Sequence, residues 1–432
     1  MPELLWKGKR KGAARASPRA SLRVEEIHGD AGESGVWRNR LVLGDARRVL
    51  SSMLPQLEGR VALVYVDPPY GTGGSFDYLA SIPGAPKEAR VAVPAYTDAG
   101  DLDAWLAMFA DTASLLRRLL ADGGSLYVHL DAHVAHYAKV VLDEIFGAAA
   151  FQREIVWRIG WVSGFKSQAR GWIRNHDTIL FYAKGGRPRT FRKAYVPYPP
   201  GYVRRDGSPP RGKGHPIDDV WNASEADRLD SIQIMSFSGE KVGYPTQKNE
   251  ALVARIVAAS SEPGDLVLDA FTGSGTTAVV AEKLGRRWIA CDASPVAVHA
   301  TRRRLLALRN SRPFVLEVDG GRAAGALRAR ARLDGRRCHV EITSFTTPAH
   351  ARGSGAAASV EHWSQWLDGW CVDWEHRGGS LRSGSWLTRL GARPLPLTCA
   401  HDYERTGRRV VLVRAYDVLG GVWSRALPVH VR

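Results

Sequence analysis

The sequence predicts an α/β protein with a largely parallel sheet, followed by a small β-rich domain. Three observations support this prediction. Strongly apolar runs at 61–66 and 266–268 each end at an aspartate and a loop, as buried parallel strands do. Segments with apolar residues at helical spacing separate such runs. Beyond about residue 328 the pattern changes to short β-type runs between Gly and Pro turns.

The composition indicates two domains and a basic surface. A chain of 432 residues is too long for one typical core. Its 60 Lys and Arg against 44 Asp and Glu give a net charge of +16, which suits a polyanionic partner such as nucleic acid. Arg-rich chains without such a partner share this property. The four scattered cysteines form no Cys-x-x-Cys pair, which argues against a zinc ribbon or disulfide framework and fits a reduced cytoplasm.

Residues 1–35 are predicted to form a basic, disordered tail. Lys and Arg recur from Lys7 to Arg23, and no apolar stretch follows that is long enough for a signal peptide or a membrane span. A solvated terminus and a phosphate-contacting arm explain this charge equally well. We therefore expect no membrane association.

Residues 36–184 are predicted to form the first half of the α/β domain. Structure is expected to begin near Val36, where the apolar run 40–43 leads to Gly44-Asp45. The run 61–66 consists of apolar, mostly β-branched residues, which predicts a buried parallel strand. The strand ends directly at Asp67.

A helix and a further strand follow in the same half. Asp101 is placed to cap a helix whose apolar residues recur near helical spacing as far as Gly123-Gly124. A strand at 125–129 comes at once after these glycines. The order strand, helix, strand predicts a parallel sheet.

Residues 185–243 differ in texture from their surroundings. They are rich in Pro, Gly, Arg and Tyr without clear periodicity, as in the run 198–202. Such an insert is predicted to be a loop-rich surface element, and loops of this kind often carry recognition.

Regular periodicity returns in residues 244–315, which are predicted to be the second half of the α/β domain. The expected order is helix, strand, glycine loop, helix and strand, with helix 250–259, strand 266–268 ending at Asp269, and strand 288–291 ending at Asp292. This is a second βαβ unit.

A Gly, Ala and Arg stretch at 316–327 is predicted to be a linker to an accessory β-rich domain at 328–432. Four tryptophans in this domain recur every three to four residues. A stacking platform for bases and a packed core both fit such spacing, and we favour the core. The residues are Trp363, Trp366, Trp370 and Trp374.

The glycine loop between the two strands of the second unit is typical of a nucleoside-cofactor site. Backbone without side chains approaches the cofactor closely, and the acid Asp292 at the end of the next strand can bind ribose hydroxyls. The loop also matches a nicotinamide fingerprint, Gly-x-Gly-x-x-Ala. However, four residues separate the strand from the first glycine, and Asp269 would repel a pyrophosphate while suiting a cationic sulfonium.

The second chemical motif is Asp67-Pro68-Pro69-Tyr70 at the end of the strand 61–66. An amino nitrogen conjugated to a base ring is a poor nucleophile, because its lone pair is delocalised. The Asp67 carboxylate and the Pro68 carbonyl can accept its N–H bonds and localise that lone pair, while Tyr70 stacks on an extruded base. The two prolines restrict the loop, although such a motif alone also fits an ordinary turn.

The two motifs together resemble the β-class DNA amino-methyltransferases, in which the catalytic loop precedes the cofactor loop and a target-recognition region lies between them. The resemblance runs from about Asn39 to Leu306. It implies a Rossmann-like, circularly permuted fold with S-adenosylmethionine as cofactor. It also implies that the insert contains the DNA contacts, for which the candidates are Arg204, Arg205, Arg211 and Lys213, with phosphate favoured over base.

The resemblance assigns cofactor-binding roles residue by residue. In the glycine loop these are Phe271, Thr272, Gly273, Ser274, Gly275, Thr276 and Thr277, with Asp269 near the amino acid moiety and Asp292 on the ribose. Asp45 is similar to the acid that contacts the adenine amino group, and Thr246, Gln247 and Lys248 resemble a segment lining the methionine end. The stretches 155–157 and 175–182 are like those that flank the target-base pocket.

The sequence leaves several alternatives for the acceptor of the methyl group. Asp as the first catalytic residue favours adenine N6, whereas Ser is more frequent there in members that act on cytosine N4. The same chemistry on RNA and a catalytically inactive DNA-binding regulator are the alternatives. Carbon-5 cytosine methylation is excluded, because none of the four cysteines follows a proline.

The same resemblance indicates the partners, whereas the prediction about metals comes from the histidines and from the chemistry. It implies double-stranded DNA as substrate, and it suggests a homodimer and a restriction endonuclease as partners. His129, His133 and His136 have a spacing that metal ligands also show, but we favour satisfied structural histidines and predict no metal. Methyl transfer from a sulfonium needs none.

Overall fold

A mixed sheet of eleven strands forms the centre of the fold. The computed structural model describes residues 3–9, 18–29, 37–71, 73–82, 90–97, 100–161, 168, 170–232, 235, 238–320, 327–346, 360–389 and 394–432. Within these residues the strand order is β11-β7-β8-β6-β3-β12-β13-β2-β14-β1-β18. The strands are β1 (Leu22–His28), β2 (Asn39–Leu43), β3 (Val61–Val66), β6 (Leu120–Leu130), β7 (Phe151–Arg158), β8 (His176–Ala183), β11 (Val220–Trp221), β12 (Leu266–Asp269), β13 (Arg287–Asp292), β14 (Phe314–Asp319) and β18 (Leu381–Arg382).

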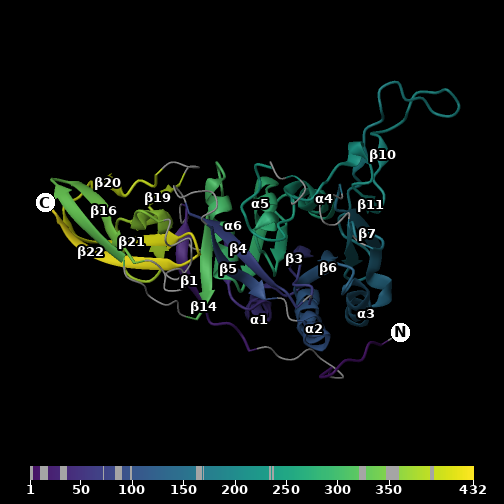
Figure 1. Cartoon of the computed structure of the whole chain (residues 1–432), viewed down its shortest axis with the longest axis horizontal. Coiled ribbons are helices and arrows are strands. Elements are labelled where there is room, and N and C mark those ends of the chain that lie inside the picture. The colour runs from purple at the N-terminus through teal and green to yellow at the C-terminus, as the bar shows by residue number, and fades with distance from the viewer. Residues whose placement is uncertain are drawn as a thin grey trace.

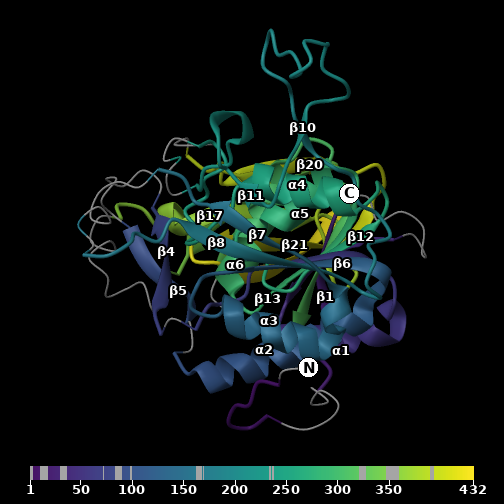
Figure 2. The ribbon, with the colours of Figure 1, turned by 90° about the vertical axis from the view of Figure 1, so that its right-hand side faces the viewer.

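Among the described residues, three helices cover each face of this sheet. Figure 2 shows α1, α2 and α3 below the sheet and α4 and α5 above it. Strand β3 serves both layers, since Val64 and Val66 pack with the first set while Leu63 and Tyr65 pack with the second. The first set is α1 (Ala46–Leu57), α2 (Leu102–Leu119) and α3 (Ala135–Phe146), and the second is α4 (Glu250–Ser260), α5 (Thr276–Lys283) and α6 (Pro295–Ala307). This layered arrangement confirms the α/β class.

The two halves of the chain meet at the centre of the sheet. Strand β3 pairs in parallel with β12, and β12 pairs in parallel with β13. Because the carboxyl ends of parallel strands lie at one edge of a sheet, the loops after β3, β12 and β13 come side by side. The permuted order predicted from the sequence is therefore the observed one.

The predicted helix start at Asp101 is correct, since its side chain accepts a hydrogen bond from the backbone N–H of Asp103 at 3.0 Å. The helix ends at Leu119 and β6 begins at Leu120, so the strand starts earlier than residue 125. Gly123 lies inside the strand with a φ of 71°, where an added Cβ would meet the backbone nitrogen of Arg189 at 2.9 Å. The glycines thus allow close approach of a neighbouring segment, and they do not end the helix.

Two boundary predictions were wrong. Residues 22–28 form β1, which pairs antiparallel with β14, and so are no part of a disordered tail. Residues 316–319 belong to β14 and so are no part of a linker. Both errors arise because the partners that stabilise these strands lie far away in the sequence. The predicted start at Val36 and the linker residues 321–326 lie outside the described residues.

The C-terminal region forms two antiparallel sheets that pack face to face. Their shared core contains Trp366, Trp370 and Trp374, which confirms the core interpretation of the tryptophan row; Trp363 packs against that core. One sheet is β15 (Leu327–Asp334), β16 (Arg337–Phe345) and β20 (Thr398–Asp402). The other is β19 (Ser385–Thr388), β17 (Leu367–Asp373), β21 (Gly407–Asp417) and β22 (Val422–Val431), and the turn η6 (Trp363–Trp366) precedes β17.

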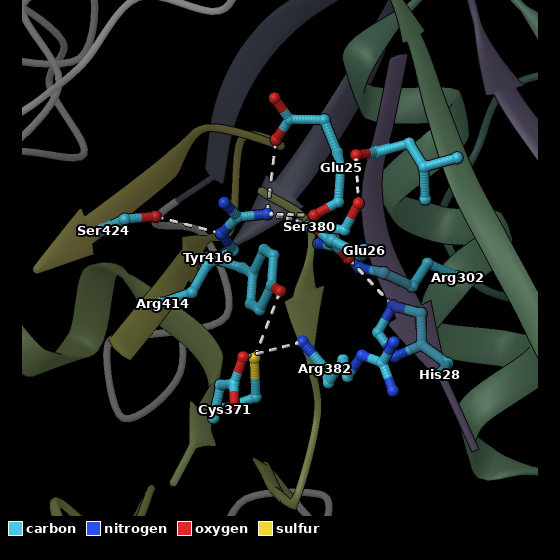
Figure 3. A network of polar contacts seen from close by, with 12 residues as sticks. Glu25, Glu26, His28, Arg302, Cys371, Ser380, Arg382, Arg414, Tyr416 and Ser424 are labelled. Carbon is cyan, nitrogen blue, oxygen red and sulfur yellow. Dashed lines mark hydrogen bonds and ion pairs between the residues drawn. The ribbon is translucent and has the colours of Figure 1, made fainter. Parts of the chain in front are cut away.

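A buried polar network joins this β-rich region to the α/β domain (Figure 3). The Glu26 carboxylate of β1 is fully buried and contacts the guanidinium groups of Arg302 at 3.3 Å and Arg414 at 3.4 Å. Burial alone would raise the pKa of Glu26, but Arg302 and His28 hold it well below its ordinary value. Strand β18 also pairs with β1 and so extends the central sheet. The two regions are therefore joined by buried contacts.

The remaining elements lie at the periphery. A hairpin of β4 (Ser75–Ser81) and β5 (Arg90–Thr97) lies in front of the sheet, and the insert contains β9 (Tyr195–Val196), β10 (His215–Pro216) and the turn η3 (Glu225–Asp227). The turn η1 (Ala148–Ala150) precedes β7. The loop beside β10 projects beyond the body of the molecule (Figure 1). None of the helices in the described ranges combines the length and hydropathy that a membrane crossing requires.

Candidate active site

The loop after β3 holds its aspartate in a fixed geometry. Asp67 accepts a hydrogen bond from the Tyr70 hydroxyl on Oδ1 at 2.5 Å and one from Lys248 Nζ on Oδ2 at 2.5 Å. The buried indole of Trp105 donates to the carbonyl oxygen of Pro69. Burial and the neighbouring Asp67 carboxylate raise the pKa of Tyr70 well above its ordinary value, so its hydroxyl stays protonated. The loop is preorganised by its own Tyr70 and by contacts from two other segments.

Lys248 lies at the catalytic loop. Besides its contact with Asp67, its ammonium group lies 3.4 Å from the Tyr70 hydroxyl and 3.4 Å from the carbonyl of Thr246. Thr246 has a φ of 56°, the left-handed region that residues with a Cβ rarely adopt. Gln247 is buried, accepting from Val242 N at 3.0 Å and donating to Glu240 O at 2.7 Å. Its amide therefore shapes the loop that carries Lys248.

The glycine loop after β12 requires both of its glycines. Gly275 has a φ of 81°, and an added Cβ would lie 2.5–2.8 Å from the side chain of Thr301 on α6. At Gly273 an added Cβ would lie 3.2 Å from the ring of Tyr244. The backbone N–H of Gly273 donates to Asp292 Oδ2 at 2.8 Å. The loop is therefore packed closely between α6, Tyr244 and the end of β13.

The hydroxyl groups of the loop mostly bond to the protein. Thr276 Oγ1 donates to the Lys248 carbonyl at 3.1 Å and lies 3.2 Å from Ser274 Oγ. Arg304 of α6 donates to the Ser274 carbonyl and to Thr276 Oγ1, both at 3.0 Å. The Thr277 side chain hydrogen-bonds to Asp269. Arg304, seen in the sequence only as one of several arginines on a helix, is thus a support of the loop.

Two buried carboxyl groups end β12 and β13 at this loop. Burial raises the pKa of Asp269 to about 7, and the nearby carboxylates of Asp67 and Asp292 add to that effect. Burial also raises the pKa of Asp292 to about 6. A positively charged or hydroxyl-bearing ligand would stabilise both ionised forms.

Asp45 caps helix α1. It accepts hydrogen bonds from the backbone N–H groups of Arg47 at 3.0 Å and Arg48 at 3.3 Å, and from the Arg47 guanidinium at 3.0 Å. Its partial burial opposes ionisation, but the Arg47 guanidinium and these N–H groups lower the pKa of its carboxyl group. Asp45 is therefore an anion at the end of β2.

The loops after β3, β12 and β13 line one cavity of about 520 Å³. Gly275 is not among the lining residues. Further lining residues come from elements in which no motif marked a binding site, among them Met108 and Thr112 of α2 and Pro94 and Ala95 of β5. The predicted residues that line it are Asp45, Asp67, Pro68, Pro69, Tyr70, Thr246, Gln247, Lys248, Asp269, Phe271, Thr272, Gly273, Ser274, Thr276, Thr277 and Asp292.

Two polar groups at this cavity fit a nucleoside cofactor. Within the described chain, Thr272 Oγ1 and Ser294 Oγ are buried and have no hydrogen-bond partner, although both residues line the cavity. A buried hydroxyl without a partner is unfavourable by about 1–3 kcal/mol. Ribose hydroxyls and an amino acid moiety would satisfy these groups together with the carboxylates of Asp269 and Asp292. The residues present therefore fit S-adenosylmethionine.

A chain of hydrogen bonds runs behind the catalytic loop. The Tyr65 hydroxyl lies 3.0 Å from His129 Nδ1, and His129 Nε2 lies 3.2 Å from Asp177 Oδ2. His133 Nδ1 lies 2.7 Å from Asp131. Across the described residues, no three His, Cys, Asp or Glu side chains are placed to bind a metal ion. His129 thus connects the segment 175–182, predicted to flank the base pocket, with the strand that carries Asp67.

The four basic candidates of the insert lie away from this cavity. Arg204, Arg205, Arg211 and Lys213 are exposed and do not line it. The loop that carries them is braced by aromatic rings, since Tyr198 and Tyr202 stack at 4.8 Å and both contact His215 edge-on. The Tyr198 hydroxyl also donates to the Arg211 carbonyl at 3.0 Å. The insert therefore presents its cations on a braced, projecting loop.

The fold and the cavity define an S-adenosylmethionine-dependent methyltransferase. A family model described as DNA methylase, of the N6/N4 methyltransferase type, matches residues 61–303, which is more than half of the chain. The chain belongs to this family and is a DNA methyltransferase. Residue 61 opens β3 and residue 303 lies in α6, so the match includes both loops and the insert between them.

The chain is also similar to individual methyltransferases. The chain is 28% identical to the type II methyltransferase M.EcaI of Enterobacter cloacae over 333 residues, covering 62% of this chain and 69% of that protein. It is 26% identical to the DNA adenine methyltransferase YhdJ of Escherichia coli strain K12, covering 68% and 91%. Among solved structures, the M1.HpyAVI–SAM complex is 20% identical with a TM-score of 0.41, covering 62% of this chain and 99% of that one. The cytosine-N4-specific PvuII DNA methyltransferase is 19% identical with a TM-score of 0.40, covering 63% and 88%.

Proposed function

We propose that this chain methylates N6 of adenine at a specific sequence in double-stranded DNA. The observation that carries the proposal is Asp67-Pro68-Pro69-Tyr70, which is pinned at the carboxyl end of β3 in the same cavity as Asp269 and Asp292. Asp in the first position of this motif favours adenine. A relative named as a DNA adenine methyltransferase supports the same choice.

The catalytic loop is proposed to act on the amino group of an extruded base. Chemistry inside a cavity of this kind requires the base to leave the duplex stack. Its exocyclic N–H groups would donate to the Asp67 carboxylate and the Pro68 carbonyl, so that the nitrogen lone pair points out of the ring plane. Tyr70, next to Asp67, would stack on the base. Bound S-adenosylmethionine supplies an electrophilic methyl group.

Lys248 is proposed to position Asp67 for this step. Its ammonium group and the Tyr70 hydroxyl occupy the two carboxylate oxygens, one each. The amino group of the base would replace one of these donors, while the other keeps the carboxylate oriented. We therefore assign Lys248 a role at the catalytic loop beyond its predicted place at the methionine end.

The cofactor is proposed to lie along the glycine loop. Asp292 would accept from ribose hydroxyls, and Asp269 would lie near the positively charged amino acid moiety. Asp45 would accept from the adenine amino group. The remaining predicted residues from Phe271 to Thr277 would shape the cavity through the backbone, with Thr272 contributing its unpaired hydroxyl.

Cofactor affinity is expected to increase with pH between about 5 and 8. The pKa values of Asp269 and Asp292 are raised to about 7 and 6, so both carboxyl groups become protonated as the pH falls from 8 to 5. Their raised values favour the folded, unliganded protein at low pH, and this contribution is lost as the pH rises through 6 and 7. A ligand that binds the ionised forms releases these protons. Calorimetric titration in buffers of different ionisation enthalpy measures that release.

Asp292→Asn provides the control for this pH dependence. The variant is expected to bind more weakly at pH 8 and to lose the part of the dependence centred near pH 6. An affinity of the wild-type protein that stays constant from pH 5 to pH 8 would contradict the proposed roles of both carboxyl groups.

Nucleoside mass spectrometry of DNA and RNA tests the choice of acceptor. The chain is expressed in cells that lack their own DNA methylation, with Asp67→Ala as the inactive control. We expect N6-methyladenine in DNA alone and only with the wild-type chain. N4-methylcytosine in DNA without N6-methyladenine would overturn the choice. So would a methylated nucleoside in RNA that appears only with the wild-type chain. DNA binding without any methylated nucleoside would indicate the regulator considered above.

The cellular setting is proposed on the same grounds. Relatives named as type II methyltransferases support a restriction endonuclease as partner. The cysteines, which form no Cys-x-x-Cys pair, support the cytoplasm as location. A homodimer remains a prediction from the family resemblance. Sedimentation of the purified chain with and without DNA measures its oligomeric state.

A further inference from the structure

Strand β15 presents a row of arginines to solvent. Its sequence alternates as Leu-Arg-Ala-Arg-Ala-Arg-Leu-Asp, and Arg328, Arg330 and Arg332 are all exposed. The alternate residues from Leu327 to Leu333 pack into or against the core of the C-terminal sheets. Because side chains alternate between the two faces of a strand, the three guanidinium groups share one outward face.

The charge on this face is largely uncompensated. Residues 327–432 contain sixteen arginines and no lysine against nine acidic residues. In the described portion of the chain, neither Arg328 nor Arg332 has a carboxylate close enough for an ion pair. Arg330 pairs with Glu341 at 2.6 Å, but both side chains are exposed and such pairs are worth little. Arginine is also the residue best suited to bidentate contact with phosphate.

A series of packed contacts links the start of the row to the wall of the cofactor cavity. Leu327 pairs with Phe345, whose ring meets that of Trp423 at 4.9 Å. The turn that precedes Trp423 packs on the start of α6, where an added Cβ on Gly420 would lie 2.9 Å from the carbonyl of Pro295. Pro295 lines the cavity. The start of the arginine row is therefore linked to the wall of the cavity through packed contacts of Phe345, Trp423 and Pro295.

The position of the row relative to the cavity is fixed. The Glu26, Arg302 and Arg414 network and the pairing of β18 with β1 attach the C-terminal sheets to the α/β domain. The C-terminal sheets and the projecting insert loop lie at opposite ends of the long axis (Figure 1). A duplex that extends from the cavity along this axis in both directions would approach these two regions.

We infer that Arg328, Arg330 and Arg332 bind the phosphate backbone of the DNA that flanks the target base. Alternate residues of a strand are about 6.6 Å apart. This is close to twice the axial spacing of about 3.4 Å between phosphates of one DNA strand. The row would contact several phosphates on one side of the target and carry no sequence information. The inference requires a DNA substrate but is independent of the choice between adenine and cytosine.

The salt dependence of DNA binding tests this inference. Fluorescence anisotropy with a 30-bp duplex of mixed sequence gives the affinity at several KCl concentrations. The test variant is Arg328→Gln/Arg330→Gln/Arg332→Gln. A matched variant, Arg60→Gln/Arg117→Gln/Arg118→Gln, removes three exposed arginines near the amino ends of the central strands, opposite the cavity. Thermal unfolding of both variants confirms that the fold is intact.

The slope of log K against log salt is negative, and we expect the test variant to make it less steep by about 3. Each lost phosphate contact reduces its magnitude by about 0.9. Affinity at 0.1 M salt is expected to fall by about tenfold or more, and the matched variant is expected to resemble the wild type. Three Arg→Lys replacements in the row should keep the slope. An unchanged slope in the test variant, or an equal loss in both Gln variants, would overturn the inference. Because binding to mixed-sequence DNA needs no methyl transfer, failure of the proposed reaction would leave this result unaffected.

Discussion

Asp67→Ala is expected to lower the rate of methyl transfer by at least about 10³-fold while leaving cofactor affinity within a few-fold of the wild type. The variant removes the carboxylate that would orient the amino group, whereas the glycine loop and its carboxyl groups are untouched. Asp67→Asn should retain a little more activity, because its amide still offers one acceptor oxygen. Single-turnover transfer of labelled methyl groups to DNA measures the rate, and equilibrium titration measures the affinity.

Asp122→Asn is the matched control for this experiment. Asp122 is fully exposed and lies within β6, remote from the reaction. It is expected to behave as the wild type in both measurements. A rate for Asp67→Ala within tenfold of the wild type would show that this carboxylate does not act on the acceptor.

Gly275→Ala is expected to weaken cofactor binding by about 100-fold or more, and it has the second largest effect that we predict. A left-handed φ costs a residue with a Cβ about 1–2 kcal/mol. In addition, the new Cβ would lie 2.5–2.8 Å from the side chain of Thr301, so α6 or the loop must move. That movement would disturb the contact of the Gly273 N–H with Asp292. Calorimetric titration of the cofactor measures the loss.

Gly285→Ala separates backbone strain from the steric clash. Gly285 also has a left-handed φ, 75°, but the nearest atom to an added Cβ is 3.9 Å away. This variant should lose only about 1–2 kcal/mol of stability and keep its cofactor affinity. If Gly275→Ala and Gly285→Ala had the same cofactor affinity, the close packing of the glycine loop on α6 would be irrelevant to binding.

Local patterns were sufficient to predict much of the α/β domain. The apolar runs at β3 and β12, the capping aspartate Asp101 and the glycine loop each specify their structure within a few residues of sequence. Strand β1 could not be predicted in this way. Its Glu26 is tolerated in a buried strand only because Arg302 and Arg414 reach it from 276 and 388 residues away.

The composition of the site was predictable, but its internal contacts were not. The motifs identified both loops, and the pairing of β3 with β12 brings them together. The bond between Lys248 and Asp67 joins residues 181 apart and depends on side-chain geometry that no motif encodes. The same is true of Arg304 behind the glycine loop and of Ser294, whose hydroxyl is buried at the cavity.

Transfer of a deuterated methyl group from S-adenosylmethionine to purified DNA tests the central claim most directly. The claim is that the loops after β3 and β12 form one active site for methylation of an exocyclic amino nitrogen. Mass spectrometry of the hydrolysed nucleosides should place the label in N6-methyladenine for the wild-type protein and in no nucleoside for Asp67→Ala. Label in 5-methylcytosine, or equal incorporation by the two proteins, would contradict the claim.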